Sequence, residues 1–544
     1  MLSLFRFFFS LITTFSIVFS SLFNPAHILT PSEDFDFEYL EYPVQAVKTL
    51  EEAGLTEEEL LSRAKDENGG LYVEAQGHSD INGVIVSPYY TAKIGDTQIP
   101  VYAATVFLGT TQSGALHSFS EIYVEKGKDF VFNIELDSAD YKIRNAIVLP
   151  ESLAVGAKCS GGKMTASISD YGIYTFLFNG AEQEHAYTLF VREAIDEEAE
   201  ISALKAEYGA ENVTVFEKGL HNLDYLHFSS NNSILYLKRG SYLLANHKYD
   251  IGSEEDELLY IEEEALTSNA IWLTRFPFIN FFNCNNVKIL GNGVIDLNAL
   301  DRRERRGVVF NFCNNVEVRG IKIINCPEWS FITYQCENMT ISETDIFGYK
   351  QNADAFAICS SRNVTVDNCF ARSGDDLFDV KALGGENAIS RNVTFTNCIA
   401  WAGKARCFGI CGEVHNEISN ITFKDCAVIY RDATWHDDRI GSLAIVVEQQ
   451  GGNISDITFE NIEIFRDDGR AISCVILEDS IKNFTAENIR FKNISYTSHL
   501  PSKVAANNES NTVSAAFENI VRNGKKISGG RYFEIDDYAD VTFE

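Results

Sequence analysis

The segment 350–381 contains three aspartates whose spacing suggests acid–base chemistry. Asp354 closes an Asn-Ala-Asp triplet, and Asp375 and Asp376 close a Gly-Asp-Asp triplet. Each triplet leads into a short apolar run, AFAICS or LFDVKA, which is typical of a β-strand. Because carboxyl groups gathered this closely cannot all ionise cheaply, at least one pKa should rise and hold a proton near neutral pH. A protonated acid beside carboxylate bases is what hydrolysis of a glycosidic bond requires.

The elements that must position these aspartates belong to a sequence repeat. An Asn-Val-Thr-Val type of turn and strand recurs at regular intervals, beginning at Asn286, Asn315, Asn338, Asn363, Asn392, Asn420, Asp456 and Asn483. Each unit has room for short strands and turns only, so it cannot bury its apolar face alone and must stack on its neighbours. The repeat predicts an all-β fold, a right-handed parallel β-helix over residues 196–544, with Asn side chains stacked at the turns.

The repeat also predicts how the aspartates line up between coils. Counting from the strands places Asp354 level with Leu377, one residue from Asp376, and with Arg406 on the following coil. Neighbouring coils lie about 4.8 Å apart. The Asp375–Asp376 pair, Asp354 and Arg406 should therefore form a column at the strand ends. A ladder of turn-capping aspartates without catalytic function would explain the same spacing.

Eleven of the 12 cysteines, all except Cys159, lie within the same repeat. A stack of buried thiols explains their placement better than disulfides do. No histidine accompanies Cys407 and Cys411, so zinc is not indicated, and we expect neither a metal nor a cofactor. Four cysteines are predicted to share one column: Cys284, Cys313, Cys336 and Cys359.

The chain before the repeat divides into three parts. Residues 1–23 are apolar with one arginine, which is typical of a signal peptide, an uncleaved N-terminal anchor being the alternative. Residues 24–70 form an acidic spacer with a helix predicted from about residue 43 to 64. Short alternating runs over residues 71–195 predict a β-sandwich, and residues 195–210 predict a short helical connector. We expect a secreted or cell-surface protein that is a monomer.

The formal net charge of −33 limits the partners. It argues against nucleic acid and against an anionic membrane surface. We therefore expect no nucleic-acid partner, and no membrane association beyond a possible N-terminal anchor. The expected partner is a polysaccharide or oligosaccharide substrate.

From about Val213 onward the chain resembles the polygalacturonase family, glycoside hydrolase family 28. The resemblance is carried by GNGVID at 291–296, RGIKIINCPEWSF at 319–331, NADAFAICSSRNVTV and GDDLFDVK. It implies a right-handed β-helix and an inverting hydrolase. It also implies that Asp375 is the general acid, while Asp354 and Asp376 activate the attacking water.

Two positions depart from the family pattern. Its Gly-His-Gly falls near residues 405–408, where there is no histidine, and its Arg-Ile-Lys appears as Arg439, Ile440 and Gly441. Since the family uses that basic pair on a uronate carboxylate, the missing lysine weakens the case for polygalacturonate. A sandwich followed by a β-helix also resembles the dextranase and isopullulanase family, glycoside hydrolase family 49, which favours a neutral or only partly acidic glycan.

Further side chains are candidates for substrate binding, and two other functions stay open. Aromatic rings at Trp329, Trp401 and Tyr430 could stack on sugars, and Asp379 and Lys381 are expected as an outward pair on the cleft floor. A calcium-dependent polysaccharide lyase and a non-catalytic carbohydrate-binding or adhesin β-helix are the alternatives. The predicted substrate-binding residues are Asn352, Arg406, Arg439, His436, Lys381 and Trp435.

Overall fold

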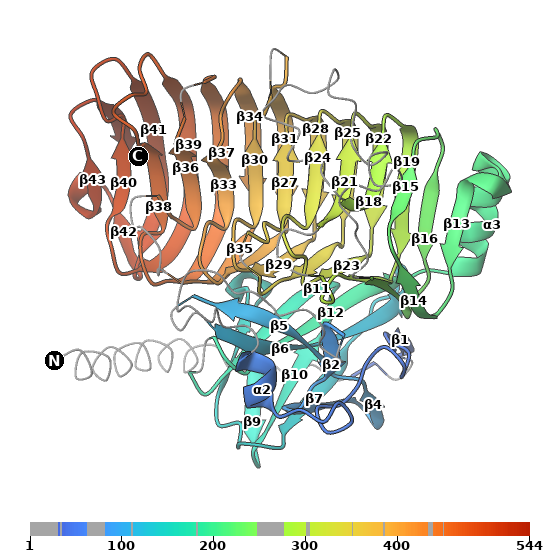
Figure 1. The fold of residues 1–544 in the computed structure, drawn as a ribbon. Helices are drawn as coiled ribbons and strands as arrows, with labels where there is room; N and C mark the ends of the chain where they lie inside the picture. The colour runs from blue at the N-terminus through green and yellow to red at the C-terminus, as the bar shows by residue number, and fades with distance from the viewer. Residues whose placement is uncertain are drawn as a thin grey trace. The chain divides into compact units, whose positions relative to one another are not determined.

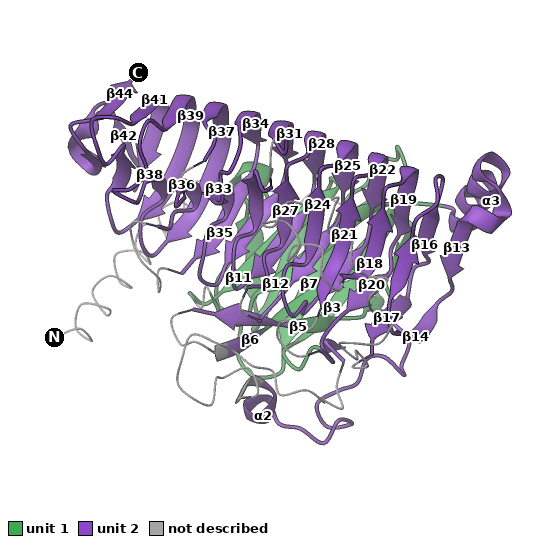
Figure 2. Cartoon of the chain, turned by 45° about the horizontal axis from the view of Figure 1, so that its top comes forward, with its two compact units in different colours: residues 1–40, 86–103, 116–195 green, residues 41–85, 104–115, 196–544 purple. Residues whose placement is uncertain are grey.

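The computed structural model describes most of the chain. The described residues are 31–32, 35–62, 82–109, 113–180, 183–246, 277–300, 305–350, 352–384, 387–432, 439–449 and 451–544. They divide into two compact units, residues 1–40, 86–103 and 116–195 in one and residues 41–85, 104–115 and 196–544 in the other (Figure 2). One unit ends at residue 195, and residues 41–85 and 104–115 group with residues 196–544. The predicted signal or anchor, residues 1–23, lies outside the described residues.

The predicted N-terminal sandwich consists of two sheets. Apolar and polar residues alternate along several of their strands, as expected where one sheet face is buried. The strand order of the first sheet is β2-β5-β6-β12-β11-β8 with β1 beside β6, and that of the second is β4-β3-β7-β10-β9. The first sheet comprises β1 Phe37–Tyr39, β2 Val84–Val86, β5 Tyr102–Leu108, β6 Ser113–Glu125, β8 Ala146–Leu149, β11 Gly172–Phe178 and β12 Tyr187–Ala194, and the second comprises β3 Tyr90–Ile94, β4 Thr97–Ile99, β7 Phe132–Ser138, β9 Ala157–Ser160 and β10 Lys163–Ile168.

Two α-helices occur among the described residues. Helix α2 spans only Glu57–Ser62, which is shorter than the helix predicted over 43–64. Helix α3, Glu197–Tyr208, confirms the predicted connector, and the Asp196 side chain caps it by accepting a hydrogen bond from the backbone of Ala199. It lies at one end of the β-helix beside β13, and the C-terminus lies at the other end (Figure 1). Within the described residues, neither helix is long and apolar enough to cross a bilayer.

The repeat forms the predicted right-handed parallel β-helix. In a typical coil two strands join one long sheet and the third joins a second sheet, each pairing in parallel with its counterpart on the next coil (Figure 1). The first sheet contains β13 Val213–Phe216, β14 Gly219–Leu223, β16 Ile234–Leu237, β17 Ser241–Ala245, β19 Asn285–Gly291, β20 Val294–Asp296, β22 Asn314–Arg319, β23 Lys322–Ile324, β25 Glu337–Ser342, β26 Asp345–Phe347, β28 Arg362–Asp367, β29 Phe370–Ser373, β31 Ser390–Thr396, β32 Ile399–Ala402, β34 Ile418–Lys424, β35 Ala427–Arg431, β37 Ile454–Asp467, β39 Thr485–Ser498, β41 Thr512–Arg522, β42 Lys525–Ile527 and β44 Ala539–Phe543. The second contains β15 Leu226–Phe228, β18 Pro277–Phe282, β21 Arg306–Asn311, β24 Phe331–Tyr334, β27 Phe356–Cys359, β30 Phe378–Lys381, β33 Phe408–Gly412, β36 Leu443–Val447, β38 Ile472–Ile476, β40 Ser502–Ala505 and β43 Phe533–Ile535.

Asparagines hold the turns between coils, as the repeat predicted. Asn363, Asn392 and Asn420 adopt left-handed backbone angles, with φ of 55°, 58° and 54°. Asparagine tolerates this conformation better than most residues because its short side chain hydrogen-bonds locally. Here the amides also bond from coil to coil, since the Asn392 Nδ2 donates to Asn363 Oδ1 at 2.9 Å and the Asn420 Nδ2 to Asn392 Oδ1 at 2.8 Å. The ladder fixes the register of successive coils.

Apolar side chains stack in the interior of the same coils. Phe395, Phe423 and Phe459 are stacked with ring centroids 4.9 and 4.8 Å apart, which matches the spacing of the coils. All twelve cysteines are free thiols and all but Cys159 are buried. The stacked rings come from the same position in successive coils. The stacks therefore show how the coils are aligned.

The predicted cysteine column is correct for three of its four members. Cys284, Cys313 and Cys336 follow one another from coil to coil, as the pairings of the neighbouring strand residues show. Cys359 does not continue the column, because it pairs with Tyr334 and with Lys381. The residue at the cysteine position of that coil is Ser361, whose hydroxyl accepts a hydrogen bond from the backbone of Cys336.

Candidate active site

The three aspartates gather where strands β27, β30 and β33 begin. These strands are neighbours in one parallel sheet, and the rings of their first residues are stacked 5.0 Å apart. Two residues before each of these positions come Asp354, Asp376 and Arg406, which therefore share one register position. The predicted column forms, but the prediction that paired Asp354 with Leu377 was wrong by one residue. The aligned first residues are Phe356, Phe378 and Phe408.

Asp376 forms a buried ion pair with Arg406. The Arg406 Nη1 donates to Asp376 Oδ2 at 3.0 Å, and the Arg406 backbone N–H donates to Asp376 Oδ1 at 3.1 Å. Both side chains are almost fully buried, at 3% and 4% exposure. Charge-assisted hydrogen bonds of this kind favour a carboxylate in its anionic form. Asp376 is thus held in a fixed orientation by a cationic partner just before the start of β30.

Asp375 has a different environment from its neighbour. It is partly exposed, and its Oδ1 accepts a hydrogen bond from the backbone N–H of Asp376 at 3.0 Å. Burial and the charge of Asp376 raise the pKa of Asp375 to about 6, against the lowering effect of Lys404 and Arg406. A carboxyl group with this pKa exchanges protons near neutral pH, which is the behaviour of a general acid.

Asp354 is buried below this pair and carries a shifted pKa as well. Burial and the nearby charge of Asp375 raise the pKa of Asp354 well above its ordinary value. Its Oδ2 lies 3.7 Å from the Lys381 Nζ. The raised pKa favours the protonated form of Asp354 in the absence of substrate. This differs from the base role that the family resemblance implies for it, and it leaves Asp376 as the better placed base.

Lys381 lies beneath the aspartates as a buried cation. Its Nζ donates to the Cys411 carbonyl at 3.1 Å and to Glu413 Oε2 at 2.9 Å, and lies 3.0 Å from Asp379 Oδ2. Burial raises the pKa of Asp379 to about 8, against the charge of Lys381. The alternating residues of β30 pack in the apolar core, so Asp379 and Lys381 face the outer side of the strand, as expected. They do not form an exposed cleft floor, however, because they are only 1% and 2% exposed.

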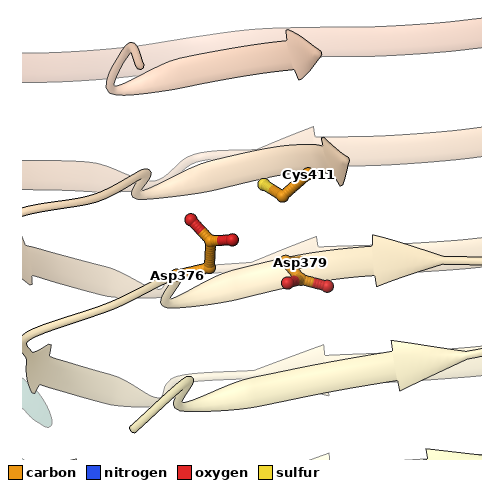
Figure 3. A group of neighbouring side chains, drawn as sticks. All are labelled: Asp376, Asp379 and Cys411. Atoms are coloured by element: carbon orange, nitrogen blue, oxygen red, sulfur yellow. The ribbon is translucent and has the colours of Figure 1, made fainter. Parts of the chain in front are cut away.

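Asp376, Asp379 and Cys411 lie close enough together to be considered as a metal site. One ligand atom from each falls within 4.8 Å of the others. Figure 3 shows the Asp376 carboxylate directed toward the next coil, which carries Cys411, while the Asp379 carboxylate is directed away from it. The Lys381 Nζ lies within 4 Å of both carboxylates. Since an ammonium group already supplies positive charge there, we propose no metal role.

Two glutamates that the sequence reading missed complete the cluster. Glu448 follows β36, and its Oε1 accepts a hydrogen bond from the Arg406 Nη2 at 2.9 Å, while its Oε2 lies 3.9 Å from the Arg439 Nη1. Glu413 follows β33 and binds Lys381. Both are acidic residues directly after an apolar strand, as in LAIVVE. The sequence contains this signal, but the three predicted catalytic aspartates all lie at strand starts.

The remaining predicted site residues are placed as follows. Asn352 has a left-handed φ of 62° and precedes Asp354 by two residues in the turn before β27. Trp435 and His436 lie outside the described residues. The Trp329 ring lies 4.9 Å from the Lys381 Nζ and is 3% exposed. The expectation that Trp401 and Tyr430 present faces to sugars was wrong, since both are at most 2% exposed.

A segment far away in the sequence supports the loop that carries the aspartates. Gly374 follows β29 and Gly403 follows β32, and Phe107 near the end of β5 packs against both. A Cβ built on Gly403 would lie 2.4 Å from the Phe107 backbone oxygen, and one built on Gly374 would lie 3.2 Å from the Phe107 Cβ. Gly403 is needed because the β5 backbone approaches where a side chain would stand, whereas at Gly374 it is the Phe107 side chain that leaves little room. Phe107 thus lies against the residue that precedes Asp375.

We expect Gly403→Ala to disturb this contact. The new methyl group would displace the Phe107 backbone, so the free energy of unfolding should fall by about 1–3 kcal/mol, and kcat should fall with it because Gly374 shares the contact. Urea unfolding and initial rates measure the two effects. Gly529→Ala is the control, since a Cβ there meets nothing within 4 Å. Equal stability of the two variants would show that the Phe107 contact is loose.

Comparison with known proteins connects this geometry with a family. Residues 272–532 match the family model of Glycosyl hydrolases family 28. The resemblance to that family is confirmed. The chain is also 25% identical over 209 residues to an exopolygalacturonase from Zea mays, covering 36% of this chain and 48% of the maize protein. The chain thus spans about half the length of the curated relatives it matches. The family 28 match supports the predicted glycoside hydrolase.

A solved structure shares the fold over a larger part of the chain. Dex49A from Penicillium minioluteum superposes with a TM-score of 0.57 at 13% sequence identity, covering 85% of this chain and 95% of the Penicillium protein. At this identity the likeness concerns the fold alone. The coverage extends well beyond the 261 residues of the family 28 segment, 272–532.

Proposed function

We propose that this protein is a secreted, inverting glycoside hydrolase that cleaves a polysaccharide or oligosaccharide. The observation that carries the proposal is the contrast between adjacent carboxyl groups. Asp376 is a buried anion paired with Arg406, while Asp375 is partly exposed with a pKa raised to about 6. Two carboxyl groups whose environments separate their protonation states are the arrangement that acid–base hydrolysis requires. The family 28 match supports the reaction class.

Each group then has a defined step. Protonated Asp375 donates its proton to the glycosidic oxygen as the bond to the anomeric carbon breaks. Asp376 accepts a proton from the water that attacks the opposite face of that carbon, so one water is added across the bond. Asp354, whose raised pKa favours its protonated form, limits the negative charge of the site and orients the attacking water by hydrogen bonding. Solvent then restores the starting protonation states.

The pH dependence of the reaction follows from this assignment. Asp375 acts as an acid, so activity needs its protonated form, which is present below its pKa and lost above it. We expect kcat/KM to decline on the alkaline side with an apparent pKa of about 6. Initial rates measured across pH 4–9 give the profile. Activity that instead increases through pH 6 would contradict the role of Asp375.

A reducing-end assay on a glycan panel tests the function. The panel contains polygalacturonate, rhamnogalacturonan, dextran, pullulan and several heteroglycans, each incubated with the wild type. Release of reducing ends without an unsaturated product is the expected result. An unsaturated, calcium-dependent product would identify a lyase. Absence of cleavage on every glycan would favour a binding protein in which the aspartates only cap turns.

A further inference from the structure

We propose that Glu448 is a specificity-determining residue that excludes uronic acids and directs the site to uncharged sugars. The proposal rests on the proposed hydrolase function and names the substrate class. It starts from the position of Glu448, which follows strand β36 two coils beyond Asp376. Its carboxylate interacts with the two arginines, Arg406 and Arg439, that could otherwise bind a carboxylate on the substrate.

Both carboxylate oxygens of Glu448 face arginine side chains. Its Oε1 accepts from the Arg406 Nη2 at 2.9 Å, and its Oε2 lies 3.9 Å from the Arg439 Nη1. The other side of the Arg439 guanidinium faces Glu478, with Nη2 3.6 Å from Glu478 Oε1. Guanidinium groups recognise carboxylates through charge-assisted hydrogen bonds, which Arg406 makes with Glu448. A uronate entering here would find Arg406 already bonded, and Arg439, which is 38% exposed, flanked by the Glu448 and Glu478 carboxylates.

Lys381, the lysine beside the aspartates, is likewise paired with the protein's own carboxylates. Lys381 is 2% exposed, and Glu413 Oε2 and Asp379 Oδ2 lie 2.9 and 3.0 Å from its Nζ. Lys404, whose charge acts on Asp375, is 4% exposed. Across the described part of the site, each cation is therefore buried or matched by a carboxylate that is not catalytic.

The electrostatic consequence distinguishes charged from uncharged sugars. A uronate carboxylate beside Asp376 and Glu448 would experience like-charge repulsion in a partly desolvated site, without an unoccupied cation to offset it. A neutral sugar carries hydroxyl groups, which donate hydrogen bonds to these same carboxylates. The cluster therefore accepts hydroxyl-rich substrates and disfavours carboxylate-bearing ones.

The test compares neutral and acidic glycans on the wild type and on Glu448→Gln. For the wild type we expect kcat/KM to be at least about a hundredfold higher on the best neutral glycan than on polygalacturonate. Glu448→Gln keeps an amide oxygen for Arg406 but removes the charge. It should shift the ratio of activities toward polygalacturonate by about tenfold, and Glu478→Gln should shift it in the same direction. Glu487→Gln, an exposed position on β39, is the control and should leave the ratio unchanged.

The outcomes separate this proposal from the function it rests on. Fastest cleavage of polygalacturonate by the wild type would overturn the specificity proposal and leave the hydrolase intact. If no glycan were cleaved, the result would count against the hydrolase function. In that case, affinity electrophoresis in gels containing dextran, pullulan or polygalacturonate would test the specificity proposal. Retardation by a neutral glycan supports it. Retardation by polygalacturonate alone, or by none of the three, overturns it.

Discussion

Asp375→Asn is expected to lower kcat on a natural glycan by about 10³-fold, because the amide cannot protonate the departing oxygen. KM should change little, since the amide keeps the shape of the side chain and its acceptor for the Asp376 backbone N–H. An aryl glycoside of the same sugar, whose leaving group needs no protonation, should lose much less activity. Initial rates on the two substrates give the comparison.

The matched control for this variant is Asp456→Asn. Asp456 lies at a repeat turn with a left-handed φ of 59°, and its carboxylate accepts a hydrogen bond from the Asn488 side chain. Other coils have asparagine at this position, so the same chemical change should leave kcat unaltered. If Asp375→Asn retained more than about a tenth of wild-type kcat on the natural glycan, Asp375 would not be the general acid.

Arg406→Met is expected to produce the largest loss of stability. Removing the guanidinium takes away the charged hydrogen-bond partner of the buried Asp376 carboxylate and leaves it with the more distant Lys381 Nζ at 3.9 Å. The free energy of unfolding should therefore fall by about 3–5 kcal/mol. The charge of Arg406 also lowers the pKa of Asp375. Its removal therefore raises that pKa, and the alkaline limit of the residual activity should move to higher pH. Chemical unfolding and the pH–rate profile measure the two effects.

Arg391→Met provides the comparison for this loss. Arg391 pairs with Glu417 on the surface, where the two side chains are 46% and 43% exposed. Because solvent screens such pairs, the substitution should cost at most about 1 kcal/mol. A similar cost for Arg406→Met and Arg391→Met would mean that the Asp376–Arg406 pair contributes no more than a surface contact.

Features that depend on local chemistry could be predicted from the sequence. The asparagine turns at Asn363 and Asn392 were predictable because few other residues adopt left-handed angles so readily. The approximate column of Asp354, Asp376 and Arg406 followed from the same period. Its register was wrong by one residue because turn lengths differ between coils, and counting along the chain cannot locate the extra residue. Strand pairing alone fixes that alignment.

Features that depend on distant or interior contacts were not predictable in this way. Phe107 reaches Gly403 from a different part of the chain, and nothing in either local sequence indicates the contact. The burial of Trp401 beneath the Arg372 guanidinium, 3.6 Å from its ring, is likewise a property of the packed coil. The sequence alone predicts that Lys381 is an exposed strand residue. Its burial depends on the carboxylates that neutralise it, Asp379 on the same strand and Glu413 on the next coil.

The anomeric configuration of the first product tests the central claim most directly. Proton NMR would follow cleavage of the most rapidly hydrolysed glycan by the wild type, in the first minutes before the product mutarotates. The account predicts that the new reducing end appears with the configuration opposite to that of the bond cleaved, because water activated by Asp376 attacks the face opposite the proton donated by Asp375. A product that initially retains the configuration would require a covalent intermediate and would contradict the roles assigned to these two carboxyl groups.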